Sequence, residues 1–146
     1  MKQLILFLSI LFLATACSND DSDKSNVAYT VIAQNDLSGK EGQTKSNIVI
    51  KDAETWNKLL TETDIKNFVS TFTETEIDFT KYQVIVMYDE MHPYNGYFVD
   101  IKSITESNST ITVYLDYRNA GGIATVLTRP FKIAKIAKSN KKVVFK

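Results

Sequence analysis

The sequence predicts an α+β fold: a mostly antiparallel, meander-rich β-sheet packed with one or two helices. Apolar and polar residues alternate along Thr110–Tyr117, which is typical of a strand that buries one face. The run Tyr82–Tyr88 is apolar at nearly every position, which indicates a central strand covered on both faces. Earlier in the chain, Trp56, Leu59 and Leu60 recur at helical spacing and predict one amphipathic helix.

The composition is that of an ordinary globular protein. The 146 residues include 17 basic and 17 acidic side chains, and 44% are hydrophobic. Nucleic-acid-binding proteins usually carry a clustered basic excess, so this balance argues against a nucleic-acid partner. Residues 27–146 contain no internal repeat and no Pro/Gly/Ser-rich break, which predicts a single domain.

Residues 1–16 have the pattern of an export signal. Lys2 is followed by the apolar run Leu4–Leu13 and the small residues Ala14–Ala16. The apolar run is shorter than the roughly 20 residues that a transmembrane helix needs. Cys17, the only cysteine, comes next, and the stretch resembles a bacterial lipobox. The resemblance implies acylation of Cys17 and a membrane anchor, whereas the alternative is a plain secretory signal.

Residues 17–26 are predicted to be the lipidated cysteine and a flexible acidic tether. The segment after Cys17 has no apolar residue up to Asn26, so it cannot bury surface to offset its ordering entropy. Its carboxylates resemble the acidic export signal of surface lipoproteins in Bacteroidota; the other interpretation is a solvated spacer. The expected location is the bacterial cell envelope, as an outer-membrane lipoprotein on either leaflet. The acidic residues are Asp20, Asp21 and Asp23.

The first half of the domain holds short strands and the helical segments. Strands are predicted at Val27–Ala33 and Asn47–Lys51, separated by the polar connection Asp36–Lys45. Asp52 is placed to cap the helix that contains the apolar stripe. Weaker helical spacing recurs over Ile65–Phe72 and predicts a second helix.

The second half is β-rich. Pro130 cannot donate a ladder hydrogen bond, so an edge position or a bulge is expected there. Alternate connections of a meander lie at the same end, so residues 92–96 and 118–122 should share one end, opposite residues 107–109. The strands predicted after the central one are Tyr97–Thr105, Thr110–Tyr117, Ile123–Thr128, Phe131–Ala137 and Lys142–Phe145.

Catalytic and metal-binding patterns are sparse. His92 is the only histidine, which excludes a His-rich zinc site, and acylated Cys17 cannot form a Cys-His pair. Asp89 and Glu90 are not surrounded by a calcium-loop pattern, and there is no G-x-S-x-G motif. We therefore predict no catalytic residue, metal or cofactor; a hydrolase that uses His92 as general base is a third hypothesis.

The shared loop end is the candidate binding site. Loops on a rigid sheet often carry binding residues, and Tyr and Arg are favoured in protein-binding hot spots. Two unremarkable surface loops are the ordinary alternative. The candidate partner-binding residues are His92, Tyr94, Asn95, Arg118 and Asn119.

Several segments together resemble one known family. They are Asp52–Trp56, Ile77–Thr80, Asn95–Ile101, Thr128–Ile133 and Val143–Phe145. Across roughly residues 48–146 the chain is similar to the PrcB C-terminal domain family, whose members are lipoprotein subunits associated with an extracellular protease complex. The resemblance implies a non-catalytic subunit that binds or stabilises a protease.

The functional expectation is thus an exported, lipid-anchored, non-catalytic envelope protein that binds a protein partner or stabilises a protease complex. Its partners would be the membrane, through the N-terminal lipid, and a secreted or surface protease or another envelope protein. The alternative is a small-molecule or glycan-binding lipoprotein with an aromatic platform at Tyr94, Tyr97 and Phe98. A concave aromatic pocket would favour this alternative, and a flat loop end would favour the protein partner.

Overall fold

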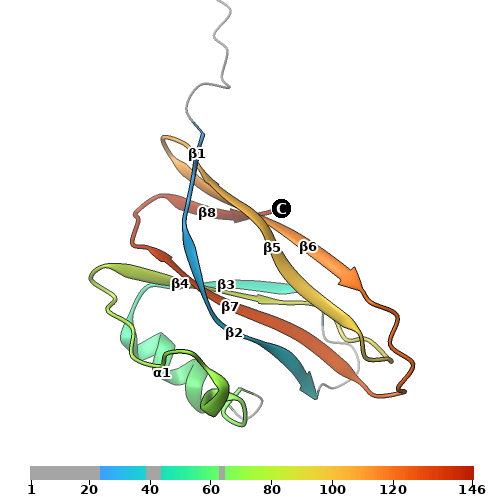
Figure 1. Ribbon diagram of the computed structural model, residues 1–146. Helices are drawn as coiled ribbons and strands as arrows, with labels where there is room; N and C mark the ends of the chain where they lie inside the picture. Colours follow the sequence, from blue (N-terminus) through green and yellow to red (C-terminus); the bar gives the residue numbers. More distant parts are fainter. Residues whose placement is uncertain (1–23, 39–43, 63–64) are drawn as a thin grey trace, which may run out of the picture.

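The computed structural model describes residues 24–38, 44–62 and 65–146, which form two facing four-stranded β-sheets and one α-helix (Figure 1). The strand order is β2-β7-β4-β3 in the helix-covered sheet and β1-β5-β6-β8 in the outer sheet. This confirms the expected mostly antiparallel β-structure with a packed helix. The predicted signal segment and Cys17 lie outside the described residues. Among the described residues, no helix has the length and apolar character needed to span a bilayer.

The helix-covered sheet has an apolar face on each side, as predicted for its central strand. Val84 and Val86 of β4 face the helix, whereas Ile85 and Met87 face the outer sheet, and all four are fully buried. The edge strand β2 continues beyond the predicted end at Ala33 and includes the first residues of the predicted polar connection. Leu37 explains the longer strand, because its side chain is buried in the core while the side chains next to it are not. The strands are β2 (Tyr29–Ser38), β3 (Ser46–Ile50), β4 (Tyr82–Tyr88) and β7 (Thr128–Ala137).

Helix α1 (Ala53–Thr61) covers this sheet and begins as the sequence predicts. The Asp52 carboxylate accepts the Thr55 N–H at 2.8 Å and caps the first turn. Trp56 and Leu59 are buried against the sheet, and the Trp56 indole N–H donates to the Thr75 carbonyl at 2.7 Å. The helix thus encloses a first hydrophobic core on the face of this sheet that points away from the outer sheet.

The predicted second helix over Ile65–Phe72 is wrong. This segment forms turns and a short 3₁₀ helix, η1 (Val69–Thr71). The Thr71 hydroxyl donates to the Phe68 carbonyl at 2.7 Å, a local bond that competes with helical pairing. The apolar side chains are still used, because Phe68 and Phe72 pack against the core beneath the helix.

The outer sheet is built on one long hairpin, and a second core lies between the two sheets. Ile111 and Val113 of β6 are buried there, so the predicted inner face of that strand is confirmed. β8 runs parallel to β6, whereas the other pairs are antiparallel. The connection from β4 to β5 passes from one sheet to the other. The strands are β1 (Ser25–Asn26), β5 (Tyr97–Glu106), β6 (Thr110–Asn119) and β8 (Lys142–Phe145).

Strand β7 corrects two predictions. Residues 120–127 form no strand, and Ile123 is 94% exposed. Pro130 lies inside β7 without interrupting it: it pairs with Asp36 of β2 and lies one residue beyond the last β4 pair, Tyr88 with Phe131. The Asp89 N–H donates to the Pro130 carbonyl at 2.9 Å, so the reciprocal bond would need the N–H that proline lacks. Arg129 Nε donates to the Asp89 carbonyl at 3.0 Å instead, which explains how a central strand accommodates proline.

The two ends of the hairpin carry different segments. Ser25 of β1 pairs with Glu106, next to the turn that joins β5 and β6. The connections from β4 to β5 and from β6 to β7 lie at the opposite end (Figure 1). The last residues of the predicted tether are therefore fixed to the sheet far from the predicted binding loops.

Candidate functional site

Two connections are bonded into one unit, here called the loop end (residues 92–96 and 119–127). His92 and Thr128 exchange backbone hydrogen bonds of 2.8 and 2.9 Å, and the Asn95 N–H donates to the Ala124 carbonyl at 3.2 Å. Gly96 has φ +91°, and a Cβ there would lie 2.5 Å from the Gly122 nitrogen. The close backbone approach therefore requires glycine at this position.

Most of the predicted site residues organise the loop end rather than extend from it. Asn95 Oδ1 accepts the Ala124 N–H at 3.1 Å, and Asn119 Oδ1 accepts the Gly121 N–H at 2.8 Å. Tyr94 is 46% exposed, and the Arg118 side chain is 49% exposed. Tyr94 is thus the apolar residue of the predicted set that is best placed to contact a partner.

Arg118 lies on the outer face of the outer sheet, at the margin of the loop end. Its guanidinium pairs with Asp100 at 2.5 Å and with Asp116 at 3.1 Å, and it lies 4.7 Å from the centroid of the Phe98 ring. Burial opposes ionisation of Asp100, but a hydrogen bond from Lys132 and the nearby cations hold its pKa below the usual range. Arg118 is therefore partly exposed to solvent and, at the same time, links Asp100 and Asp116 through ion pairs.

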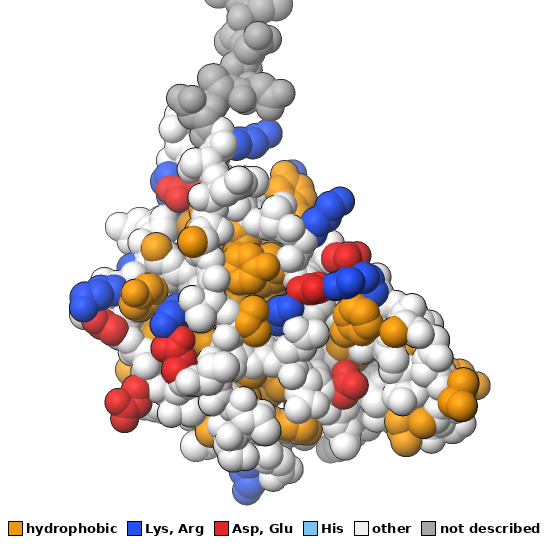
Figure 2. Space-filling view, in the orientation of Figure 1, with side chains coloured by type: hydrophobic (Ala, Val, Ile, Leu, Met, Phe, Trp, Pro, Cys, Tyr) orange, Lys and Arg blue, Asp and Glu red, His pale blue; other side chains and the backbone are white. Residues whose placement is uncertain are grey.

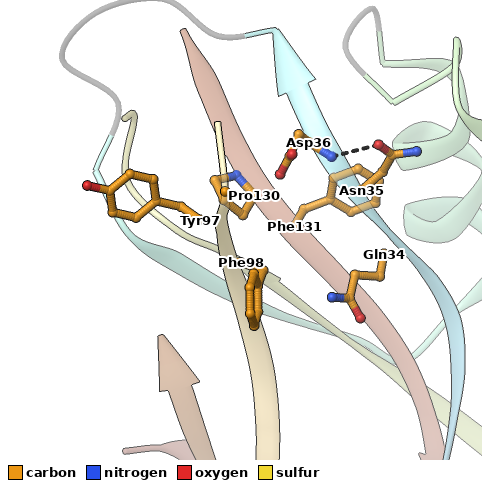
Figure 3. A pocket seen from close by; sticks show the side chains of 8 residues that line it. Gln34, Asn35, Asp36, Tyr97, Phe98, Pro130 and Phe131 are labelled. Atoms are coloured by element: carbon orange, nitrogen blue, oxygen red, sulfur yellow. Dashed lines mark hydrogen bonds between the residues drawn. The ribbon is translucent and has the colours of Figure 1, made fainter. Parts of the chain in front are cut away.

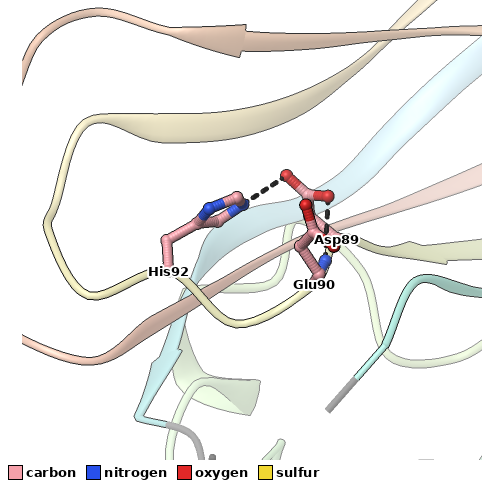
Figure 4. A group of neighbouring side chains, drawn as sticks. All are labelled: Asp89, Glu90 and His92. Atoms are coloured by element: carbon pink, nitrogen blue, oxygen red, sulfur yellow. Dashed lines mark hydrogen bonds and ion pairs between the residues drawn. The ribbon is translucent and has the colours of Figure 1, made fainter. Parts of the chain in front are cut away.

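His92 is mostly covered and belongs to a polar cluster beneath the loops (Figure 4). His92 Nε2 lies 2.9 Å from an Asp89 carboxylate oxygen, and its ring stacks on Tyr97 with centroids 3.7 Å apart. Lys45 Nζ lies 3.4 Å from the other Asp89 oxygen and 3.7 Å from the Tyr117 ring centroid. Burial, followed by the charges of Asp89 and its acidic neighbour, raises the pKa of Tyr117.

The cluster also brings together three groups that could hold a metal ion. Ligand atoms of Asp89, Glu90 and His92 all lie within 4.8 Å of one another. However, the buried Asp89 carboxylate already faces His92 and Lys45 and accepts the Glu90 N–H at 2.8 Å. The Lys45 ammonium already neutralises the Asp89 carboxylate and would repel a metal cation bound there. We infer that these residues fix the start of the connection from β4 to β5.

The loop end exposes large apolar side chains, three of which lie in the segment predicted to be the strand Ile123–Thr128. Of the seven exposed large apolar side chains in the described part of the chain, four lie here. Figure 2 shows hydrophobic side chains extending from this end of the molecule. The sequence signal for this exposure is the uncharged run Ile123–Leu127, in which apolar and polar residues do not alternate as they do in a half-buried strand. The four are Tyr94, Ile123, Val126 and Leu127, here called the apolar patch.

A cleft of about 430 Å³ opens beside the loop end, between β2 and the first residues of β5 (Figure 3). Gln34, Asn35 and Asp36 line one side, Tyr97 and Phe98 line the other, and the floor is formed by the beginning of β7. Burial raises the pKa of Asp36, and the charge of the nearby histidine partly opposes this effect. The cleft combines amide and carboxylate groups with apolar walls.

Comparison with known proteins gives no match: no family model, curated protein or solved structure matches the chain. The similarity to the PrcB C-terminal domain family therefore stays a prediction, and the functional argument depends on the site itself.

Proposed function

We propose that the protein is a non-catalytic, lipid-anchored envelope protein that binds a partner protein through the loop end. The apolar patch is the observation that carries this proposal. Exposed apolar side chains that gather at one place mark interaction surfaces more often than scattered ones do. Ile123 is almost fully exposed, and its neighbours Val126 and Leu127 are each more than 40% exposed.

The position of the patch favours a protein partner over the membrane that would carry the anchor. β5 and β6 each span ten residues, which corresponds to about 33 Å at the usual rise per strand residue. The N-terminal segment meets the sheet at one end of this hairpin, and the apolar patch lies at the other. Acylation of Cys17 would therefore attach the domain to the bilayer at the end opposite the patch.

The surroundings of the patch fit a protein interface. An apolar centre with a polar rim is the usual anatomy of such interfaces, and Arg118 and Asn119 supply exposed polar groups beside the patch. The backbone bonds within the loop end limit the ordering entropy that binding would cost. Following the PrcB-like segments, we propose an envelope protease, stabilised without any catalytic contribution, as the first partner to seek.

The two other hypotheses have less geometric support. An aromatic sugar platform needs free ring faces, but one face of Tyr97 is stacked on His92 and Arg118 lies over one face of Phe98. A hydrolase needs a nucleophile, and among the described residues the only recorded side-chain hydrogen-bond partner of His92 is Asp89.

Affinity capture from detergent-solubilised envelopes tests the proposal. The bait is the full chain, the test variant replaces Ile123 and Tyr94 with Ser and Ala, and quantitative mass spectrometry measures the enriched proteins. Ile48→Ser is the matched control, because Ile48 is also exposed, at 40%, but lies on β3. We expect the test variant to reduce enrichment of the partner at least tenfold and the control to retain it. Equal enrichment by both variants, or no protein enriched by the wild type, would contradict the proposal.

A further inference from the structure

Among the described residues, the edge of β2 beside the cleft has backbone groups without a ladder partner. Within this part of the chain β2 pairs only with β7, and in β7 the Pro130 carbonyl points to the other neighbour, where it accepts the Asp89 N–H. Both backbone groups of a strand residue point to the same side, and successive residues alternate. Asp36, which lies opposite Pro130, therefore directs its own N–H and carbonyl outward.

The open part of this edge is limited to residues 34–38. By the same alternation, Gln34 and Ser38 also direct their backbone groups outward. Upstream, the Thr73 N–H donates to the Ile32 carbonyl at 2.9 Å and covers the edge there. Five residues correspond to about 17 Å, the usual length of a strand in a sheet.

The cleft receives the side chains on one face of this edge. Gln34 and Asp36 lie on the face opposite to buried Leu37, toward β5. The two sheets are held together at the far end of the cleft, where the Tyr29 hydroxyl donates to the Ile101 carbonyl at 3.4 Å. Toward Gly96 the cleft of about 430 Å³ leaves room for side chains of an added strand.

Asp36 indicates the chemistry of the occupant. Its carboxylate has no recorded hydrogen bond or ion pair among the described residues, although it is partly buried and its pKa is raised by burial. Its N–H is held by the neighbouring Asn35 Oδ1 at 2.8 Å, a contact that an incoming strand can replace. A cationic side chain on the opposite residue of an added strand would compensate the carboxylate.

We propose that an extended segment of the partner, with Lys or Arg opposite Asp36, adds to the edge of β2 as a fifth strand. This deepens the proposed function, because it specifies how a protein partner is recognised. Main-chain bonds to residues 34–38 supply affinity, and the cleft supplies specificity through the side chains that enter it. The apolar patch on the neighbouring loop end would contact the folded part of the same partner.

The probe is a displayed library of random nine-residue peptides, selected on the full chain and resynthesised for affinity measurement. We expect the selected peptides to share a Lys or Arg position. Asp36→Lys should weaken them at least tenfold and should favour resynthesised peptides with Glu at that position. Gln34→Pro removes an outward N–H without removing a ladder bond and should also weaken binding at least tenfold, whereas Gln34→Ala should not.

Amide hydrogen exchange locates the bound peptide. Exchange should slow at residues 34, 36 and 38, and circular dichroism checks that each variant is folded. The proposal is overturned if no peptide slows exchange there, if Asp36→Lys leaves the charge preference unchanged, or if soluble oligosaccharides and no peptides occupy the cleft. Envelope capture that still depends on Ile123 would then show that the loop-end proposal survives without strand addition.

Discussion

Replacing Arg129 with Ala should destabilise the protein by about 2–3 kcal/mol. The Arg129 guanidinium donates a hydrogen bond to the carbonyl of buried Asp89 at 3.0 Å. The ring nitrogen of Pro130 has no hydrogen and cannot donate this bond. A hydrogen bond from a charged donor is worth about 1.5–3 kcal/mol, and a buried carbonyl without a donor keeps its desolvation cost. Bonds to the Thr44 carbonyl and the Ser46 hydroxyl add smaller amounts near the surface.

A second substitution isolates this compensation. Pro130→Ala alone should cost about 0.5 kcal/mol, because it gives the unfolded chain more freedom. In the Arg129→Ala background it should instead recover about 1 kcal/mol, since the new N–H faces the Asp89 carbonyl. The expected coupling between the two substitutions is therefore about 1.5 kcal/mol.

Urea unfolding of the wild type, both single variants and the double variant, followed by far-UV circular dichroism, measures the cycle. The midpoints should shift without a change in slope if only native-state stability changes. Strictly additive effects of the two substitutions would refute the view that Arg129 replaces the missing proline donor.

Three further changes test other parts of the structure. Asp36→Asn should stabilise the protein at pH 7. Burial raises the pKa of the Asp36 carboxyl above 3.8 in the folded state, so the wild type loses stability as the pH rises from 3.8 through the folded-state pKa, whereas asparagine does not ionise. The gain should vanish below about pH 3 in thermal unfolding. Gly96→Ala should cost more than about 2 kcal/mol in urea unfolding, because a Cβ would lie 2.5 Å from a backbone nitrogen. Gly121→Ala, which shares the positive φ but meets nothing within 4 Å, should cost less, and equal costs would contradict this. Trp56→Phe should cost about 1–3 kcal/mol through the lost indole N–H bond of 2.7 Å, and a circular dichroism midpoint within error of the wild type would show that the bond is dispensable.

Local sequence patterns predicted the elements whose burial is set by their own residues. Alternation gave the hairpin strands, a continuous apolar run gave β4, and Asp52 gave the start of α1. Each depends on which face of a short segment meets a core. The separation into two sheets was not predictable in this way, because it depends on which distant strands pair.

The errors around β7 have a common physical cause. The rule that excludes proline from a central strand assumes that the missing donor has no substitute, but Arg129 provides one from the adjacent position. The run that begins at Ile123 was assigned to a strand because of its apolar composition, although nothing in a local window shows whether a core covers it. The predicted binding residues therefore lie at the same end of the fold as the apolar patch, but the exposure of Ile123, Val126 and Leu127 was missed.

The arrangement of the N-terminal segment and the loop end also determines how the domain would bear mechanical load. A partner held at the loop end and an anchor attached ahead of Ser25 would pull β2 and β7 in opposite directions along their axes, because β2 follows the N-terminal segment and β7 follows the loop end. Antiparallel ladder bonds are perpendicular to the strands, so tension in this direction shears many bonds together instead of opening them one at a time. A domain anchored and loaded as we propose would transmit a pull from its partner to the membrane through this ladder.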